Sequence, residues 1–200
     1  PLAQLVLATS VVRAFAGIPS YLVNVESFWR HSLYTGVLVR LLAAKIDTPH
    51  PETLFTAALL HDIGFVLLCQ AMPERMRHVL DRVRKHSLPL EVAEHDEWGY
   101  THAVVGGELA RAWGLGEWLE CLIETHHDST YSSLCRRECA LITVADHLAT
   151  VQQYAIERNP LMYPLDAEVL ILAGWAGPES PLDVLPLADG QYATLARALA

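Results

Sequence analysis

The sequence has no excess of basic charge, and this absence argues against one broad class of function. Its 200 residues include 14 lysines and arginines against 23 aspartates and glutamates, which gives a formal net charge of −9. Proteins that recognise nucleic acids through their phosphates present a concentrated positive surface. We therefore expect no nucleic-acid partner.

Long hydrophobic runs are also missing. No uninterrupted apolar stretch reaches the roughly 18 residues that a membrane-spanning helix needs. The chain also does not begin with a charged segment followed by an apolar one, the pattern of a signal peptide. We expect a soluble, cytoplasmic protein without a membrane partner. The chain begins at Pro1 rather than at a methionine and runs directly into an apolar segment, so we expect a piece of a longer protein.

Cysteines are few, and no short spacing pairs them. The sequence contains no Cys-x-x-Cys motif of the kind found in zinc ribbons and redox proteins. We interpret the cysteines as small apolar core residues of a protein in a reducing compartment. They are Cys69, Cys121, Cys135 and Cys139.

The alternation of apolar and polar residues that is typical of strands is absent, and no internal repeat is present. Apolar positions instead recur at steps of three and four residues, which predicts an all-α fold. With 52% hydrophobic residues, a chain of this length suits a single domain over residues 1–200. Helices are expected over residues 2–16, 25–46, 51–70, 73–86, 87–99, 101–113 and 136–156, with one ending at 126–127, and short helices within 160–200, the last from 191.

An adjacent histidine and aspartate interrupt the apolar helix expected over residues 51–70. Burying the carboxylate of Asp62 beside His61 is costly unless a metal, a cation or several donors satisfy it. The dyad therefore requires partners from elsewhere in the chain. Candidates lie in or beside four other apolar segments, namely His31, His102, His126 with His127, and Asp146.

Imidazole nitrogens and carboxylate oxygens are ligands of divalent Fe, Mn, Ni, Co and Zn, and this set is large enough for one or two ions. One ion would be held by His31, His61, Asp62 and Asp146, and a second ion, sharing Asp62, by His102, His126 and His127. A metal pair supports phosphoester hydrolysis by activating water. The alternative is a metal-free hydrogen-bonded cluster, with His31 or Arg30 pairing with Asp62.

Five motifs carry a family resemblance. In chain order they are Phe-Trp-Arg-His-Ser at 28–32, Leu-Leu-His-Asp-Ile-Gly at 59–64, Tyr-Thr-His-Ala-Val-Val-Gly at 100–106, Trp-Gly-Leu at 113–115 and His-His-Asp at 126–128. This order resembles the HDOD family of bacterial signalling domains, related to HD phosphohydrolases and HD-GYP phosphodiesterases of cyclic di-GMP. The resemblance covers about residues 20–150.

The resemblance implies an HD-domain-like multi-helix bundle that serves as an output or regulatory module, often behind a receiver domain as in response regulators. The implied partners are signalling proteins or an upstream receiver or sensor domain. It also implies metal ligation by the seven residues named above, with Glu94 at an acidic position of the family. We expect Arg30 to pair with Asp62 or Glu94. Residues 1–24 would be the end of an N-terminal helical half whose beginning is missing.

Three departures from the related patterns favour a role without turnover. Phe65 stands where HD-GYP proteins usually have lysine, no Gly-Tyr-Pro signature follows the paired histidines, and Thr101 stands where HDOD proteins commonly have aspartate. We therefore expect a signalling domain that acts through protein contacts, with an intact or vestigial metal site. The alternatives are a metal-dependent phosphohydrolase acting on a nucleotide or cyclic dinucleotide, and an interaction domain without a ligand.

Overall fold

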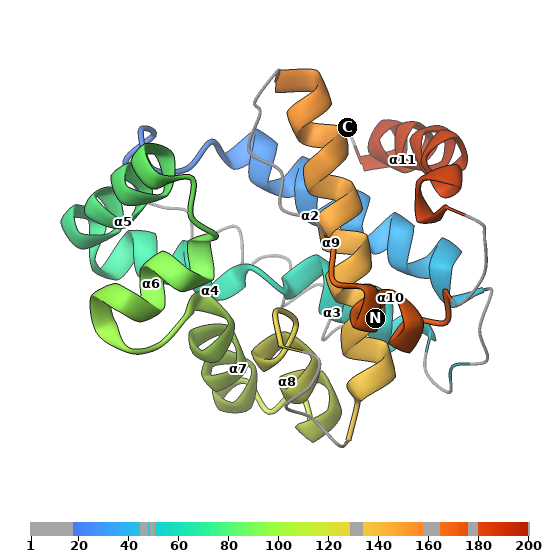
Figure 1. Ribbon diagram of the computed structural model, residues 1–200, viewed down its shortest axis with the longest axis horizontal. Coiled ribbons are helices and arrows are strands. Elements are labelled where there is room, and N and C mark those ends of the chain that lie inside the picture. The colour runs from blue at the N-terminus through green and yellow to red at the C-terminus, as the bar shows by residue number, and fades with distance from the viewer. Residues whose placement is uncertain are drawn as a thin grey trace.

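The computed structural model describes residues 18–44, 48, 51–128, 134–157, 165–175 and 180–199. Within these ranges all regular elements are helices and no strand occurs, which confirms the expected all-α class (Figure 1). The helix expected over residues 2–16 lies outside them. The α-helices are α2 Val25–Ala43, α3 Pro51–Leu60, α4 Ile63–Ala71, α5 Pro73–His86, α6 Leu90–Trp98, α7 His102–Ala112, α8 Glu117–Glu124, α9 Arg136–Glu157, α10 Ala167–Leu172 and α11 Leu185–Leu199, and the short 3-10 helix η1 spans Pro181–Val184.

The core lies where α2, α3, α8 and α9 pack together. Helix α2 begins at Asn24, whose side chain accepts a hydrogen bond from the backbone N–H of Ser27 at 2.9 Å. The apolar side chains between these helices are fully buried, and burying each contributes about 1.5–3 kcal/mol. They include Leu38, Leu42, Leu54, Leu122, Leu141 and Ile142. The long helix α9 thus forms one wall of the core, with α2 and α3 packed against it (Figure 1).

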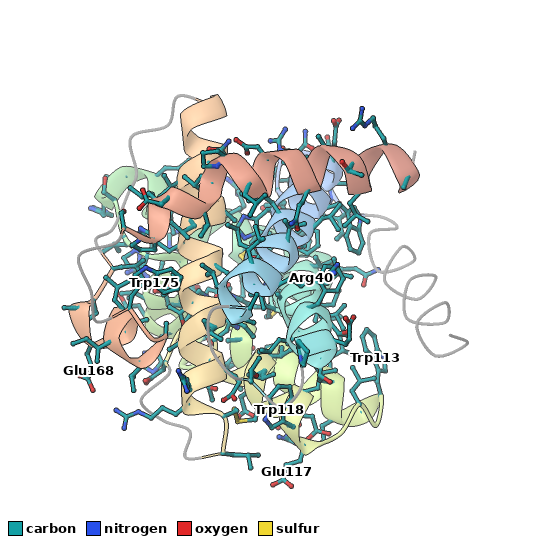
Figure 2. The ribbon with its side chains drawn as sticks, turned by 90° about the vertical axis from the view of Figure 1, so that its right-hand side faces the viewer. Arg40, Trp113, Glu117, Trp118, Glu168 and Trp175 are labelled. Atoms are coloured by element: carbon teal, nitrogen blue, oxygen red, sulfur yellow. A yellow bond between two sulfur atoms is a disulfide. The ribbon has the colours of Figure 1, made fainter. Side chains whose placement is uncertain are left out.

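Helix α11 lies across α2 and α9 (Figure 2). Its carboxylate Asp189 accepts two hydrogen bonds, from the Tyr34 hydroxyl at 2.6 Å and from Gln152 Nε2 at 2.9 Å. Burial and the neighbouring Asp189 raise the pKa of Tyr34, so its phenol stays protonated and able to donate. One side chain of α11 therefore ties it to both helices beneath.

The prediction of a single helix over residues 51–70 is wrong. The chain turns at His61 and Asp62, which divides this stretch into α3 and α4. In a continuous helix these two side chains would project about 100° apart. At the corner, both can face the same centre. A second difference is that α11 begins at Leu185 rather than at residue 191, with Pro186 in its first turn, where its missing N–H costs no hydrogen bond.

Among the described residues, the stretch Pro51–Ala71 is apolar and long enough to cross a membrane by composition alone. In the fold, 56% of its most apolar window is buried. A buried core helix of a folded domain has the same properties.

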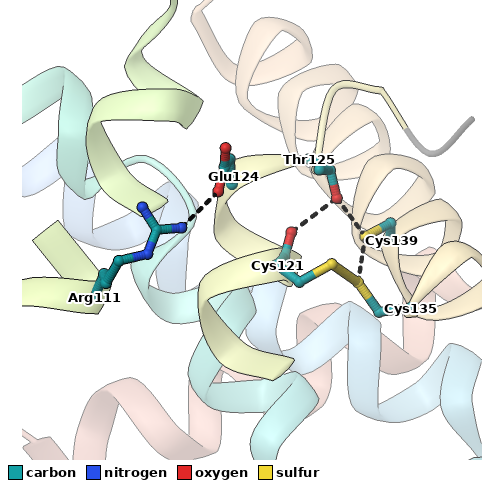
Figure 3. Close-up of a disulfide and its surroundings, with 6 residues drawn as sticks. All are labelled: Arg111, Cys121, Glu124, Thr125, Cys135 and Cys139. Atoms are coloured by element: carbon teal, nitrogen blue, oxygen red, sulfur yellow. Dashed lines mark hydrogen bonds and ion pairs between the residues drawn. A yellow bond between two sulfur atoms is a disulfide. The ribbon is translucent and has the colours of Figure 1, made fainter. Parts of the chain in front are cut away.

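The interpretation of the four cysteines as apolar core residues in a reducing compartment did not anticipate a disulfide. Cys121 and Cys135 form a disulfide that joins α8 to the residue before α9 (Figure 3). Cys69 and Cys139 are free and buried. The two bonded cysteines are 14 positions apart, and this spacing gave no signal in the sequence, because the proximity of the two sulfurs depends on how α8 and α9 pack.

Candidate metal centre

His61, at the α3–α4 corner, has one ring nitrogen fixed by the backbone. Its Nδ1 lies 2.7 Å from the carbonyl oxygen of Ala58, which can only accept, so Nδ1 carries a proton. The other nitrogen, Nε2, is buried without a hydrogen-bond partner and lies 3.1 Å from Asp62 Oδ2. Burial opposes a charge on the ring, but Asp62 and Asp146 outweigh it and hold the pKa of His61 well above its usual range. A bound cation would take the place of that extra proton.

His126 repeats this arrangement in the turn after α8. Its Nδ1 donates to the carbonyl oxygen of Ile123 at 2.7 Å, while its Nε2 is buried without a hydrogen-bond partner. That Nε2 lies 3.7 Å from Asp62 Oδ1. Burial and three neighbouring imidazoles lower the pKa of His126 well below its usual range, so the ring is neutral. A neutral imidazole with Nδ1 protonated directs a lone pair from Nε2 toward Asp62.

Glu94 fixes His102 at the start of α7. The Glu94 carboxylate is fully buried, and its Oε2 accepts from the His102 backbone N–H at 2.8 Å and from Nδ1 at 2.6 Å. The Nε2 of His102 therefore lies 3.2 Å from Asp62 Oδ1 and 2.9 Å from His127 Nε2. Burial lowers the pKa of His102, but Glu94 and Asp62 together raise it to about 10. A histidine that binds a metal usually donates its other ring N–H to a carboxylate or a carbonyl, as His102 does to Glu94.

Asp146 on α9 and His31 on α2 complete the other side of the centre. Their Oδ1 and Nε2 atoms are 2.9 Å apart, and Asp146 Oδ1 lies 3.6 Å from His61 Nε2. Burial raises the pKa of the Asp146 carboxyl, but His31 and His61 outweigh it, so its pKa lies well below the usual range. Asp146 is therefore ionised and able to act as a ligand.

The structure brings all seven candidate ligands together, in two groups that meet at Asp62. Asp62 Oδ2 faces His61 and His31, at 3.1 and 3.9 Å, while Oδ1 faces His102 and His126. In each group the donor atoms lie within 4.8 Å of one another. Adjacent ligands of one ion lie roughly 3.0–3.4 Å apart at octahedral and tetrahedral angles. The separations of 3.1 and 3.2 Å at Asp62 fall in this range, whereas those of 3.7 and 3.9 Å are longer, so some but not all of these pairs already have the spacing of ligands on one ion.

The remaining supporting residue, Arg30, contacts the first turn of α2. Its guanidinium Nη2 donates to Ser27 Oγ at 3.3 Å, while the carboxylates of Asp62 and Glu94 contact histidines. Thr101 precedes α7 without a side-chain cap hydrogen bond. Glu94 accepts the first backbone N–H of that helix instead.

Two features that support the site were not assigned a role from the sequence. Gly64 lets α4 touch α7, since a Cβ there would lie 2.0 Å from the carbonyl oxygen of His102. Thr143 on α9 donates from its hydroxyl to the carbonyl oxygen of His126, which anchors the turn of the paired histidines. The glycine belongs to the motif at 59–64, so the motif was visible although the close approach was not.

The centre lies at the base of a cleft of about 670 Å³. Asp62 and four other candidate ligands line it, whereas His61 and His126 lie fully buried behind. Apolar side chains form much of its walls, and Arg84 adds a cation. The wall residues include Leu22, Phe65, Leu80, Leu90 and Val169.

The family model described as the HDOD domain matches residues 1–129 of the chain. No curated protein matches. Three solved structures share the fold. An HDOD domain protein of unknown function from Geobacter sulfurreducens has a TM-score of 0.65 and 22% sequence identity, with 88% of this chain and 62% of that one covered, and a candidate phosphohydrolase from Shewanella amazonensis SB2B has a TM-score of 0.65 and 22% identity, with 86% and 61% covered. The response regulator MmoQ from Methylococcus capsulatus str. Bath has a TM-score of 0.56 and 21% identity, with 82% of this chain and 62% of that one covered.

The chain spans about three fifths of the length of these structures. At 21–22% identity they establish the fold, while the family model establishes membership. That model covers well over half of the chain and includes six of the seven candidate ligands, all but Asp146. This chain belongs to the HDOD domain family.

Proposed function

We propose that this chain is a bacterial signalling domain that holds two divalent metal ions at its centre and transmits its state through contacts with other signalling proteins. The observation that carries the metal proposal is the pair of buried nitrogens, His61 Nε2 and His126 Nε2, that have no hydrogen-bond partner. Leaving such atoms unpaired costs about 1–3 kcal/mol each. Cations on either side of Asp62 would satisfy both.

The side chains at the centre determine which ligands each ion would have and which metals suit them. His31, His61 and Asp146 with Asp62 Oδ2 provide one set, and His102, His126 and His127 with Asp62 Oδ1 provide the other. Nitrogen and carboxylate ligands without thiolate suit Mn, Fe, Co, Ni or Zn. Ions held there would polarise an anionic group that enters the cleft.

The signalling role is supported by the resemblances. The chain belongs to the HDOD family and shares its fold with MmoQ, which is described as a response regulator. In this proposal, metal or ligand binding in the cleft changes how the helices around it pack, and a partner protein binds one of the resulting states. Such coupling requires different affinities for the two states.

Single-histidine variants test the metal proposal. We expect elemental analysis of protein loaded with Mn²⁺ to give two ions per chain, and His31→Ala and His126→Ala to give one ion each, because each removes a ligand from one group only. The control is His78→Ala, an exposed histidine on α5, which should retain two ions. A wild-type protein that binds no divalent ion after incubation with Mn²⁺, Fe²⁺ or Zn²⁺ would contradict the proposal.

The cleft favours a second candidate function, hydrolysis of a phosphoester. Its volume of about 670 Å³ is that of a small-molecule site, and the candidate metal ligands line its base. If the protein is a hydrolase, metal-loaded protein should release linear dinucleotide from cyclic di-GMP, and His61→Ala should abolish that release. If it is a signalling domain without turnover, the wild type and His61→Ala should give the same background rate.

A further inference from the structure

Three of the four cysteines gather where α8 meets the start of α9 (Figure 3). Besides the Cys121–Cys135 disulfide, the free sulfur of Cys139 lies 3.4 Å from Cys135 Sγ. Cys135 and Cys139 are fully buried. A thiol is thus held against one sulfur of a disulfide, at a site outside the candidate metal centre.

Thr125 determines how that thiol is oriented. Its single hydroxyl proton is donated to the carbonyl oxygen of Cys121 at 2.8 Å, and its Oγ1 lies 2.9 Å from Cys139 Sγ. Because the threonine proton is already used, the S–H of Cys139 donates to Thr125. The lone pairs of the Cys139 sulfur are then free to face Cys135.

We propose that Cys121, Cys135 and Cys139 form a thiol–disulfide exchange site with two oxidised isomers. Cys139 loses its proton to water and attacks Cys135 Sγ as a thiolate; the Cys135–Cys139 bond forms as the Cys121–Cys135 bond breaks. Cys121 leaves as a thiolate and takes up a proton from water. The exchange is an isomerisation among three sulfurs, so it requires neither an oxidant nor a reductant.

The exchange creates a modification site at Cys121. Cys121 is partly exposed, whereas Cys139 is fully buried, so a small electrophile reaches the thiol in one isomer and not in the other. Burial raises the pKa of Cys139 to about 11, with a small further rise from Glu138. Only a thiolate attacks, so the exchange is slow at neutral pH.

The two isomers differ in how the paired histidines are held. The Cys121–Cys135 bond closes a loop that contains His126 and His127, whereas a Cys135–Cys139 bond lies at the start of α9 and leaves α8 unlinked. In that isomer the hydroxyl of Thr143 remains to hold His126. The position of the second ion's ligands then depends on which disulfide is present. This coupling rests on the proposed metal function, whereas the exchange itself does not.

Peptide mapping tests the exchange. The folded protein is incubated with iodoacetamide, then unfolded, labelled with isotopically heavy iodoacetamide, digested and analysed by mass spectrometry. We expect light label on Cys121 together with a Cys135–Cys139 disulfide, both increasing with time and faster at pH 9 than at pH 7. Cys139→Ala should keep the Cys121–Cys135 disulfide and leave Cys121 unlabelled. Cys69→Ala, which removes the other buried thiol, should behave as the wild type does.

Two mapping results would overturn the exchange: light label on Cys139 with the Cys121–Cys135 bond intact, or no light label on Cys121 after long incubation at pH 9. The coupling is tested separately with Mn²⁺, which thiols bind weakly. We expect Cys121→Ala to bind the second ion about 10-fold more weakly than Cys139→Ala, with the first ion unchanged. Equal Mn²⁺ affinities in the two variants would overturn the coupling. If the wild type also failed to bind Mn²⁺, the metal proposal would be overturned, and the result of the peptide mapping would be unaffected.

Discussion

Under the proposed two-ion arrangement, Asp62→Asn is expected to lose both metal ions, whereas each histidine variant should lose one. The carboxylate directs one charged oxygen to each group, Oδ2 toward His61 and Oδ1 toward His102. Asparagine has the same shape but provides one neutral oxygen. Losing a residue that merely orients a ligand weakens metal binding about 10–100-fold, so losing the bridging ligand should weaken Mn²⁺ binding by at least about 100-fold at both positions.

The experiment is a calorimetric titration with Mn²⁺, supported by elemental analysis. Asp81→Asn is the matched control, because it makes the same chemical change on the exposed surface of α5 and should leave both affinities unchanged. Circular dichroism of the metal-free variants checks that each remains helical. An Asp62→Asn protein that still binds two ions would show that Asp62 is not the bridge, and the two groups would then have to be independent sites.

The candidate site could be predicted from the sequence because burying its charged residues in apolar helices would cost free energy. Asp62 and Asp146 are carboxylates within apolar helical patterns, and such groups need partners. That reasoning depends on composition and period and not on three-dimensional detail, so it identified residues from five separate segments. The structure brings their donor atoms together in two groups, within 4.8 Å of one another in each.

The orientation of these side chains was not visible. The corner at His61 and Asp62 does not follow from the helical pattern, because Leu60 and Ile63 are apolar on both sides of it and the only nearby glycine, Gly64, lies inside α4. Glu94 was recognised as a supporting residue, but its hydrogen bonds to His102 were not predicted. Contacts between helices decide such pairings, and a single sequence does not contain them.

The disulfide also could not be predicted from the sequence alone. Reading Cys121 and Cys135 as apolar core residues was correct for the burial of Cys135, which is fully buried, and wrong for its bonding. Removing a cross-link over a loop of this length typically costs about 3 kcal/mol in the chain-entropy model. The cysteines therefore contribute to stability as well as to the exchange proposed above.

Gly64→Ala is expected to lower the free energy of unfolding by about 3 kcal/mol or more, a large effect for one methyl group. The new Cβ would lie 2.0 Å from the His102 carbonyl oxygen and 2.6 Å from the Gly106 backbone nitrogen. Both are main-chain atoms of α7, so no flexible side chain can move aside. To relieve the overlap α4 and α7 must separate, which displaces His102 from Asp62. Urea unfolding of metal-free protein measures the loss of stability.

Gly190→Ala is the matched control, since a Cβ at this helical position in α11 would meet no atom within 4 Å. There alanine should raise the free energy of unfolding by about 0.5–1 kcal/mol, because it restricts the unfolded chain and favours the helix. The two variants make the same chemical change with opposite expected signs. If Gly64→Ala proved as stable as the wild type, α4 and α7 would be free to separate, and the distance between Asp62 and His102 would not be set by their contact.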